Sequence, residues 1–241
     1  MPESVVPGDA AGAETLEIMA AAPRFNAWMY ATVAPYLGRR VLEVGSGIGN
    51  MSAHMLGADP EQLVLTDTDA WYRDQLRERF EGRAEVRVDH LTLPDPTARA
   101  RFADDRIDTI IALNVVEHIE QDVAALRTMR EVLVDGGRIV ILVPALQALY
   151  GEMDRELGHF RRYSRRSLTH TFARAGFRVD RMIWFNRAGV PGWWFNGRVR
   201  KVKRIPVDQL RTFDALVPLF RIERFLPLPF GQSLIAVGSP A

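Results

Sequence analysis

Short apolar runs alternate with helical patterns along most of this chain. Runs typical of buried strands occur at residues 40–44, 62–66, 84–88, 107–113 and 138–143. Helical patterns lie between them, for example at 69–80 and 120–133, and a helix near 165–175 precedes a strand at 177–185 and a final strand at 233–239. Apolar strands separated by helices indicate an α/β fold with a mostly parallel sheet and helices on both faces.

Two segments extend this alternating pattern. Residues 14–37 have apolar side chains at helical spacing and contain Pro23, which predicts an N-terminal helical cap made of two helices. Residues 186–230 separate the last two expected strands and are too long for a simple connection, so they predict an insert. We therefore expect residues 1–241 to form a single domain with an added cap and insert.

Composition and charge exclude several classes of protein. The chain has 241 residues and no cysteine, which excludes disulfides, thiol catalysis and cysteine–zinc sites. Its formal net charge of +1 gives no overall reason to expect nucleic acid as a partner, and we expect no DNA binding. The N-terminus does not resemble a signal peptide and no apolar run is long enough to span a bilayer, so we expect a cytoplasmic protein.

The sequence "LEVGSGIGN" places three glycines where the first strand turns into a helix. Gly45, Gly47 and Gly49 allow a ligand to approach backbone N–H groups at a helix N-terminus. Asp67 ends the second strand twenty-two residues after Gly45, where a ribose-binding carboxylate is expected. The third glycine comes one residue too early for a dinucleotide motif, and Glu43 would favour a cationic ligand over a pyrophosphate.

Several separate motifs in this order resemble those of the class I S-adenosylmethionine-dependent methyltransferases. They are "VLEVGSGIGN", Asp67 after the second strand, "VDHL" after the third, "LNVVEHIEQD" after the fourth, and "LRTMREVLVDGGRIVILVPA". The chain is most similar to the bacterial small-molecule enzymes of that family. The resemblance implies a Rossmann-like sheet of seven strands, mostly parallel, and transfer of a methyl group from S-adenosylmethionine with S-adenosylhomocysteine as product.

The resemblance also implies roles for individual residues. Those expected to bind the cofactor are Glu43, Gly45, Gly47, Gly49, Asp67, Thr68, Asp89, His90, Leu91 and Asn114. Asp67 would accept hydrogen bonds from both ribose hydroxyls. Asp89 would bind the adenine amino group, and Asn114 would lie near the sulfonium. The sequence shows no metal site, and we expect none.

The segment "MDRELGHFRRYSRR" follows the fifth strand. By the resemblance, this segment lies over the acceptor side of the active site. His159, Tyr163 and His118 are candidates for a catalytic base. Arg162, together with Tyr150 and Trp193, is a candidate for binding the acceptor. Two structural alternatives remain open: His118 caps the next helix, or ion pairs between Asp154 and arginines only staple the segment together.

We expect methyl transfer to a small organic acceptor that is anionic or hydrophobic. One alternative is a cofactor-binding protein without activity that acts as a regulator or at a membrane, and another is an NAD-dependent oxidoreductase. The insert has four alternative roles. It lines the acceptor pocket, contacts a membrane surface, joins two copies in a homo-oligomer, or forms a core helix beside a solvated basic loop.

Overall fold

The computed structural model describes residues 10–200, 202, 206–225 and 228–241. Its seven strands form a sheet in the order β3-β2-β1-β4-β5-β7-β6, in which β7 alone runs antiparallel to its neighbours. The strands are β1 (Arg40–Val44), β2 (Gln62–Asp67), β3 (Val86–His90), β4 (Thr109–Leu113), β5 (Arg138–Pro144), β6 (Phe177–Phe185) and β7 (Ser233–Pro240). The Rossmann-like sheet expected from the sequence is confirmed.

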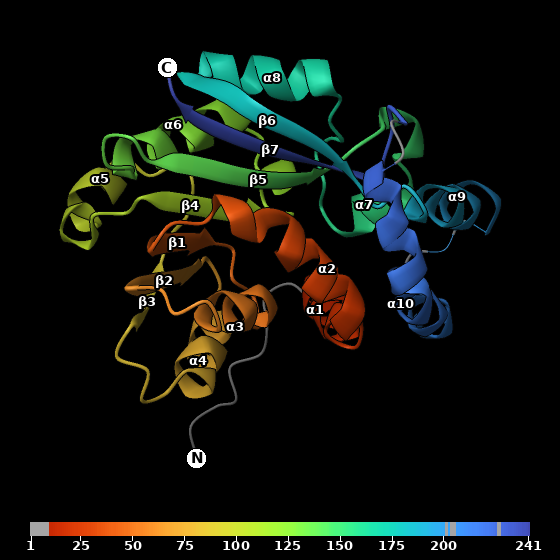
Figure 1. Cartoon of the computed structure of the whole chain (residues 1–241), viewed down its shortest axis with the longest axis horizontal. Helices are drawn as coiled ribbons and strands as arrows, with labels where there is room; N and C mark the ends of the chain where they lie inside the picture. The colour runs from red at the N-terminus through yellow and green to blue at the C-terminus, as the bar shows by residue number, and fades with distance from the viewer. Residues whose placement is uncertain (1–9, 201, 203–205, 226–227) are drawn as a thin grey trace.

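Helices cover both faces of this sheet (Figure 1). The α-helices are α1 (Ala10–Ala20), α2 (Pro23–Val33), α3 (Asn50–Leu56), α4 (Ala70–Arg79), α5 (Ala98–Arg101), α6 (Asp122–Val132), α7 (Glu152–Glu156), α8 (Arg165–Arg174), α9 (Gly189–Trp194) and α10 (Val207–Phe220). Short 3₁₀ turns are η1 (Ala34–Tyr36), η2 (Ala103–Asp105), η3 (Val116–His118), η4 (Gln147–Leu149) and η6 (Arg221–Phe225), and Phe195–Arg200 is a π-helix, η5. The helices α5, α6 and α8 pack on one face, and α2, α3, α4 and α10 pack on the other.

Strand β5, which lies between β4 and β7, shows why the inner strands are continuously apolar. Ile139 and Ile141 belong to the core beneath α6 and α8, whereas Val140 and Leu142 belong to the core beneath α2 and α3. Successive side chains of a strand point to opposite faces, so a strand covered on both sides needs an apolar residue at each position. This double burial fixes the sheet and leaves its carboxyl edge to carry polar loops.

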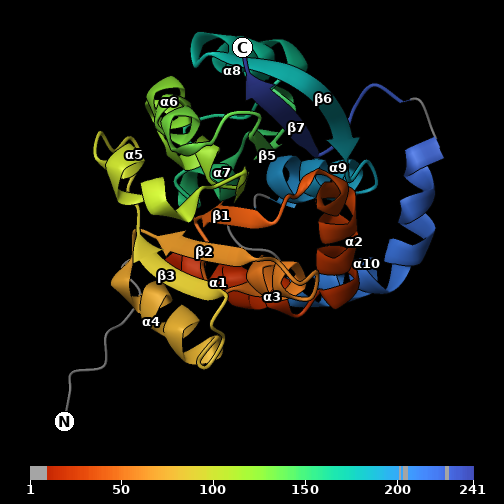
Figure 2. The same cartoon turned by 60° about the vertical axis from the view of Figure 1, so that its left-hand side comes forward.

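The N-terminal cap and the insert pack against each other beside the sheet (Figure 2). The expected break between two cap helices is confirmed, because α1 ends at Ala20 and α2 begins at Pro23. The backbone N–H of Phe25 donates to Asp214 Oδ1 on α10 at 2.8 Å, and the Phe25 ring lies 5.9 Å from that of Phe213. The cap therefore extends the core and contacts α10.

The insert is partly core and partly exposed. Leu210 and Val217 on α10 are buried, but Leu219 and Phe225 are 60% and 70% exposed. The basic run at 198–204 lies partly outside the described residues, as residues 201, 203 and 204 do. Within the part of the chain that the structure covers, the helices are too short or too polar to cross a membrane.

Candidate active site

The glycine loop joins β1 to α3 at the carboxyl edge of the sheet. Gly45 and Gly47 have φ angles of 69° and 51°, in the left-handed region that glycine adopts without strain. Gly49 is the N-cap residue of α3. A Cβ atom at position 47 would lie 2.7 Å from Leu16 Cδ1 of α1, so the loop needs glycine for its turn and for the close approach of the cap.

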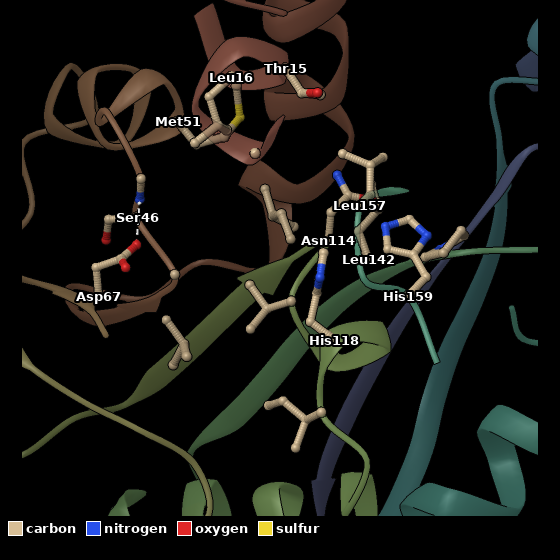
Figure 3. Close-up of a pocket in the computed structure, with 18 of the residues that line it drawn as sticks. Thr15, Leu16, Ser46, Met51, Asp67, Asn114, His118, Leu142, Leu157 and His159 are labelled. Carbon is tan, nitrogen blue, oxygen red and sulfur yellow. Dashed lines mark hydrogen bonds between the residues drawn. The ribbon is translucent and has the colours of Figure 1, made fainter. Parts of the chain in front are cut away.

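Asp67 fixes the loop from the end of the neighbouring strand. One oxygen of its carboxylate accepts from the backbone N–H of Gly47 and the other from that of Asp69, each at 3.0 Å (Figure 3). Burial raises the pKa of Asp67, and these two hydrogen bonds partly offset the rise. A carboxylate offers about four lone-pair sites, so Asp67 keeps acceptor capacity for hydroxyl groups of a ligand. Asp69 caps α4 through Trp71 N at 2.8 Å.

Glu43 lies within β1 and is 4% exposed. Burial raises its pKa to about 7, although a hydrogen bond donated by Ser52 acts in the opposite direction. A cation that binds beside a buried carboxyl group favours its ionised form and so lowers its pKa. Glu43 borders the cavity described below, where it would favour a ligand that carries positive charge.

The side chains at the end of β3 do not all face the cavity, although the sequence analysis expected them to bind the cofactor. The Asp89 carboxylate pairs with Arg87 at 2.7 Å, and the His90 ring lies 3.0 Å from Thr92 Oγ1. Neither Asp89 nor His90 borders the cavity, whereas Leu91 and Thr92 do. Of the residues expected near the adenine ring, Leu91 thus lines the cavity together with Thr92, whereas the carboxylate of Asp89 and the ring of His90 have partners outside it.

The fourth strand supplies the middle of the site. Asn114 has a positive φ of 55° and donates its backbone N–H to Leu142 O at 2.8 Å. This turn brings Asn114, Val115 and His118 to the cavity wall. The His118 ring is perpendicular to that of His159, with 4.7 Å between centroids. The two histidines come from separate segments and meet at one point.

The segment after β5 is held by a buried ion pair. Both oxygens of Asp154 accept from Arg162, whose Nε and Nη2 lie at 2.8 and 3.1 Å, and Asp154 also contacts His159 Nδ1 at 2.9 Å. Arg162 Nη1 donates to Ala145 O at 3.1 Å. Arg162 borders the cavity, but these contacts satisfy much of its donor capacity. The ion pair between Asp154 and an arginine that the sequence suggested is present, with Arg162 as the partner.

Two tyrosines predicted for the site lie outside the cavity. Tyr163 is 1% exposed and donates its hydroxyl to Asp122 Oδ2 at 2.9 Å. Burial and the Asp122 carboxylate raise the pKa of Tyr163, which keeps it neutral and unfit as a base. Tyr150 donates to the backbone oxygen of His159 at 2.7 Å, so it positions that residue instead of facing a ligand. The structure thus places neither the hydroxyl expected to act in catalysis, that of Tyr163, nor the one expected to contact the acceptor, that of Tyr150, against the cavity.

Trp193 of α9 closes the far side of the cavity. The guanidinium of Arg162 lies 4.9 Å from the centre of the Trp193 ring. Trp193 borders the cavity, whereas its neighbour Trp194 is 51% exposed. An aromatic wall of this kind suits an apolar or aromatic part of a bound molecule.

Sequence reasoning left two parts of the site without a role. The Glu117 side chain is fully buried, neither of its oxygens has a hydrogen-bond partner among the residues that the structure describes, and burial raises its pKa to about 8. Thr15, Leu16 and Met19 of α1 also line the cavity. The helical spacing of the cap predicted a helix but not that it would roof the glycine loop.

These elements surround one continuous cavity of about 1040 Å³. We call the side bordered by the glycine loop, Asp67, Thr68, Leu91 and Thr92 the cofactor half. The acceptor half is bordered by His118, Leu157, His159, Phe160 and Trp193. Figure 3 shows Asp67 on one side of the cavity and the two histidines on the other, with Asn114 close to the histidines. Two ligands can thus meet near Asn114.

A family model described as a methyltransferase domain matches residues 18–181, about two thirds of the chain. The chain belongs to the class I S-adenosylmethionine-dependent methyltransferases. The glycine cradle, the ribose-type carboxylate of Asp67 and the buried Glu43 fit S-adenosylmethionine as the cofactor of this methyltransferase. Membership in this family decides against the NAD-dependent alternative.

Known relatives resemble the methyltransferase over different lengths. The tRNA U34 carboxymethyltransferase of Pseudomonas fluorescens strain SBW25 is 28% identical over 117 residues, which cover 47% of this chain and 36% of the relative. The chain thus spans only about a third of that curated relative. A chain from the complex of the Haloferax volcanii Trm112 methyltransferase activator with a methyltransferase superimposes with a TM-score of 0.64 at 15% identity, covering 98% of this chain and 99% of that one.

A second solved structure supports the same fold. The S-adenosylmethionine-dependent methyltransferase of Mesorhizobium loti has a TM-score of 0.59 at 12% identity, covering 88% of this chain and 97% of that chain. At such identities the likeness establishes the fold, and the acceptor must be inferred from the site itself.

Proposed function

We propose that this methyltransferase methylates a small organic acceptor that binds in the acceptor half of the cavity. The observation that carries the proposal is the continuity of the cavity, which joins the Asp67 side to the His118 and His159 side. S-adenosylmethionine supplies a methyl group on a positively charged sulfur. The chain must hold the acceptor atom in line with that group, and such positioning contributes a large part of the rate enhancement.

In the cofactor half, Asp67 would hold the ribose, with Thr68 beside the adenosine. Glu43 and the glycine loop would surround the methionine part. Leu91 and Thr92 would border the adenine ring, and Asn114 would lie where the two halves meet. All of these residues except Thr92 are retained from the roles that the family resemblance implied.

Replacing Asp67 with alanine is expected to weaken binding of S-adenosylmethionine and S-adenosylhomocysteine by roughly 10- to 100-fold. A hydrogen bond to a charged group contributes about 1.5–3 kcal/mol, and this carboxylate would accept from ribose hydroxyls. Calorimetric titration of wild type and variant measures the effect. Asp89→Ala is the matched control, because Asp89 pairs with Arg87 outside the cavity and its loss should leave affinity unchanged. Equal affinities for all three proteins would contradict the role of Asp67.

In the acceptor half, His159 is the better-positioned histidine. Its Nδ1 contacts Asp154, which Arg162 holds in turn, so the ring orientation is fixed and Nε2 is the nitrogen left for a ligand. An imidazole there can accept the proton that a hydroxyl or amine acceptor loses. His118 faces His159 across the same space.

The acceptor half is mostly apolar. Arg162 is committed to Asp154 and the Ala145 carbonyl, which argues against a carboxylate or phosphate bound there by its guanidinium. Leu157, Phe160 and Trp193 supply apolar surface instead. A small acceptor with a hydrophobic or aromatic part fits this lining better than an anionic one. The formal charge of +1 also favours a small acceptor over the tRNA named for the curated relatives.

Substitutions of two adjacent tryptophans test whether the acceptor binds in the acceptor half of the cavity. Trp193→Ala should raise the KM for a small apolar acceptor by about 5- to 30-fold, because an aromatic contact of about 1–2 kcal/mol is lost. Trp194→Ala should leave KM unchanged, since Trp194 is exposed beside the cavity. The measurement is release of S-adenosylhomocysteine with a panel of small hydroxy and amino compounds.

Two outcomes of the same assay would contradict the proposal. Methylation of bulk tRNA with no small molecule accepted would assign a macromolecular acceptor. Cofactor binding without turnover on small molecules or tRNA would favour the non-catalytic regulator considered as the alternative.

A further inference from the structure

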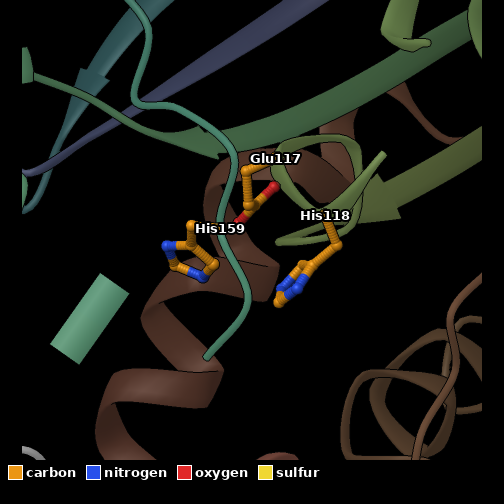
Figure 4. A group of neighbouring side chains, drawn as sticks. All are labelled: Glu117, His118 and His159. Carbon is orange, nitrogen blue, oxygen red and sulfur yellow. The ribbon is translucent and has the colours of Figure 1, made fainter. Parts of the chain in front are cut away.

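Three side chains with metal-binding atoms meet in the acceptor half. Glu117, His118 and His159 each present a ligand atom, and these atoms all lie within 4.8 Å of one another (Figure 4). The first two residues belong to η3 after β4, and His159 follows α7. A backbone hydrogen bond from Phe160 N to Glu117 O at 2.9 Å ties the two segments together at this point.

The Glu117 carboxylate has no other use that the described structure reveals. Its side chain is fully buried, and neither oxygen has a hydrogen-bond partner among the described residues. Arg162, the nearby cation, directs Nε and Nη2 to Asp154 and Nη1 to the Ala145 carbonyl. Buried carboxylates are paired or coordinate metals, because an unsatisfied one is costly. The two oxygens of Glu117 are therefore available as ligand atoms for a cation, which would favour the ionised carboxylate.

His159 is held as a metal-binding histidine is held. Asp154 Oδ1 lies 2.9 Å from Nδ1, and Asp154 is itself fixed by Arg162 and by the backbone N–H of Gly151 at 3.0 Å. A carboxylate that accepts from one ring nitrogen orients the other nitrogen toward a metal and raises its basicity. This arrangement places Nε2 of His159 as the ligand atom.

We propose that Glu117, His118 and His159 bind a divalent transition-metal cation. Two imidazole nitrogens and one carboxylate oxygen suit Zn²⁺, Mn²⁺, Co²⁺ or Fe²⁺ and leave coordination positions open. The set borders the cavity through His118 and His159, so an acceptor atom can occupy an open position. The sequence predicted no metal site because His159 lies forty-one residues beyond His118 and only the fold brings them together.

This site specifies the acceptor class, and that part of the inference rests on the proposed function. A cation of this kind binds a hydroxyl oxygen and lowers its pKa, so the hydroxyl proton passes to solvent. The oxygen then forms the new bond to the methyl carbon as the carbon–sulfur bond breaks, and S-adenosylhomocysteine leaves. His118 and His159 serve as ligands in this arrangement, and the acceptor is a hydroxyl compound.

Cobalt binding to the untagged, chelator-treated full chain tests the site. Wild type should bind one Co²⁺ per chain by calorimetry and show the visible absorption bands of imidazole-coordinated cobalt. Glu117→Gln and His118→Ala should each weaken binding by at least about 10-fold, as expected for loss of a ligand. His170→Ala is the matched control, because His170 is an exposed histidine on α8 that is not part of the cluster, and the variant should bind Co²⁺ as wild type does.

Two results would overturn the inference. Wild type that binds no Co²⁺, or binds it equally well after both Glu117→Gln and His118→Ala, would show that the cluster is not a metal site. S-adenosylmethionine binding is measured on the same samples. If wild type binds S-adenosylmethionine but not Co²⁺, the metal site alone is overturned. If wild type does not bind S-adenosylmethionine, the proposed function is overturned instead. The His118→Ala variant guards against misfolding, because its side chain is exposed.

Discussion

Replacing Asp154 with alanine is expected to lower the free energy of unfolding by about 3–5 kcal/mol. Asp154 is fully buried, and Arg162, which donates two hydrogen bonds to it, is 5% exposed. Removing the carboxylate leaves a buried guanidinium without its counter-charge, and the cost of that unpaired charge exceeds the net value of the pair. Urea unfolding followed by circular dichroism measures the change.

Two further variants separate this explanation from a general effect of mutating α7. Glu152 pairs with Arg155 on the same helix, but both side chains are about half exposed. Glu152→Ala should therefore cost less than about 1 kcal/mol. The double variant Asp154→Leu with Arg162→Met removes both charges, so it should be more stable than Asp154→Ala alone. A loss below about 1 kcal/mol for Asp154→Ala would mean that Arg162 reaches solvent when unpaired.

Replacing His159 with alanine is expected to lower kcat by about 10²- to 10⁴-fold, the usual contribution of a group that activates the acceptor, either by taking its proton or by holding the proposed metal. His159 borders the acceptor half, and Asp154 fixes its ring. Affinity for S-adenosylmethionine should stay within about twofold of wild type, because the contacts proposed for the cofactor lie around Asp67. Turnover with an accepted small molecule and calorimetry with the cofactor measure the two quantities.

His90→Ala is the matched control for this prediction. The His90 ring lies near Thr92 Oγ1 and does not border the cavity, so kcat should be retained. Unfolding curves for both variants show whether a lost contact with Asp154 changes stability as well as catalysis. A His159→Ala enzyme with wild-type kcat would remove His159 from the reaction.

The fold was predictable because the signal that specifies it is repeated along the chain. Most of the apolar runs became strands that are buried on both faces, as Ile141 and Val140 of β5 illustrate, whereas the edge strands β3 and β6 are only partly buried. Strand ends were less certain: the run at 84–88 became β3 at Val86–His90, two residues further on. The glycine loop and Asp67 were predictable from spacing alone, since the carboxyl ends of β1 and β2 are neighbours in the sheet.

The parts of the site that were missed depend on where side chains point. Asp89 was placed against the adenine, but Arg87 lies two residues away on the same face of β3 and takes its carboxylate. Tyr163 was placed in the cavity, but the bridge between Ala145 and Tyr163 directs its ring into the core beneath α8. Neither pairing can be read from residue type, because each depends on a neighbour supplied by the folded chain.

Strand β7 has a consequence for the order in which the enzyme is assembled during synthesis. It is the last of the seven described strands to leave the ribosome, yet it lies inside the sheet, between β5 and β6. β6 has β7 as its one hydrogen-bonded neighbour in the described sheet, so its backbone groups remain unpaired until residues 233–240 emerge. Gln232 and Ser233, which border the cavity, arrive with that segment. A nascent chain that stalls before β7 thus carries the glycine loop and both histidines but lacks Gln232 and Ser233 of the cavity wall and the strand that joins β6 to β5.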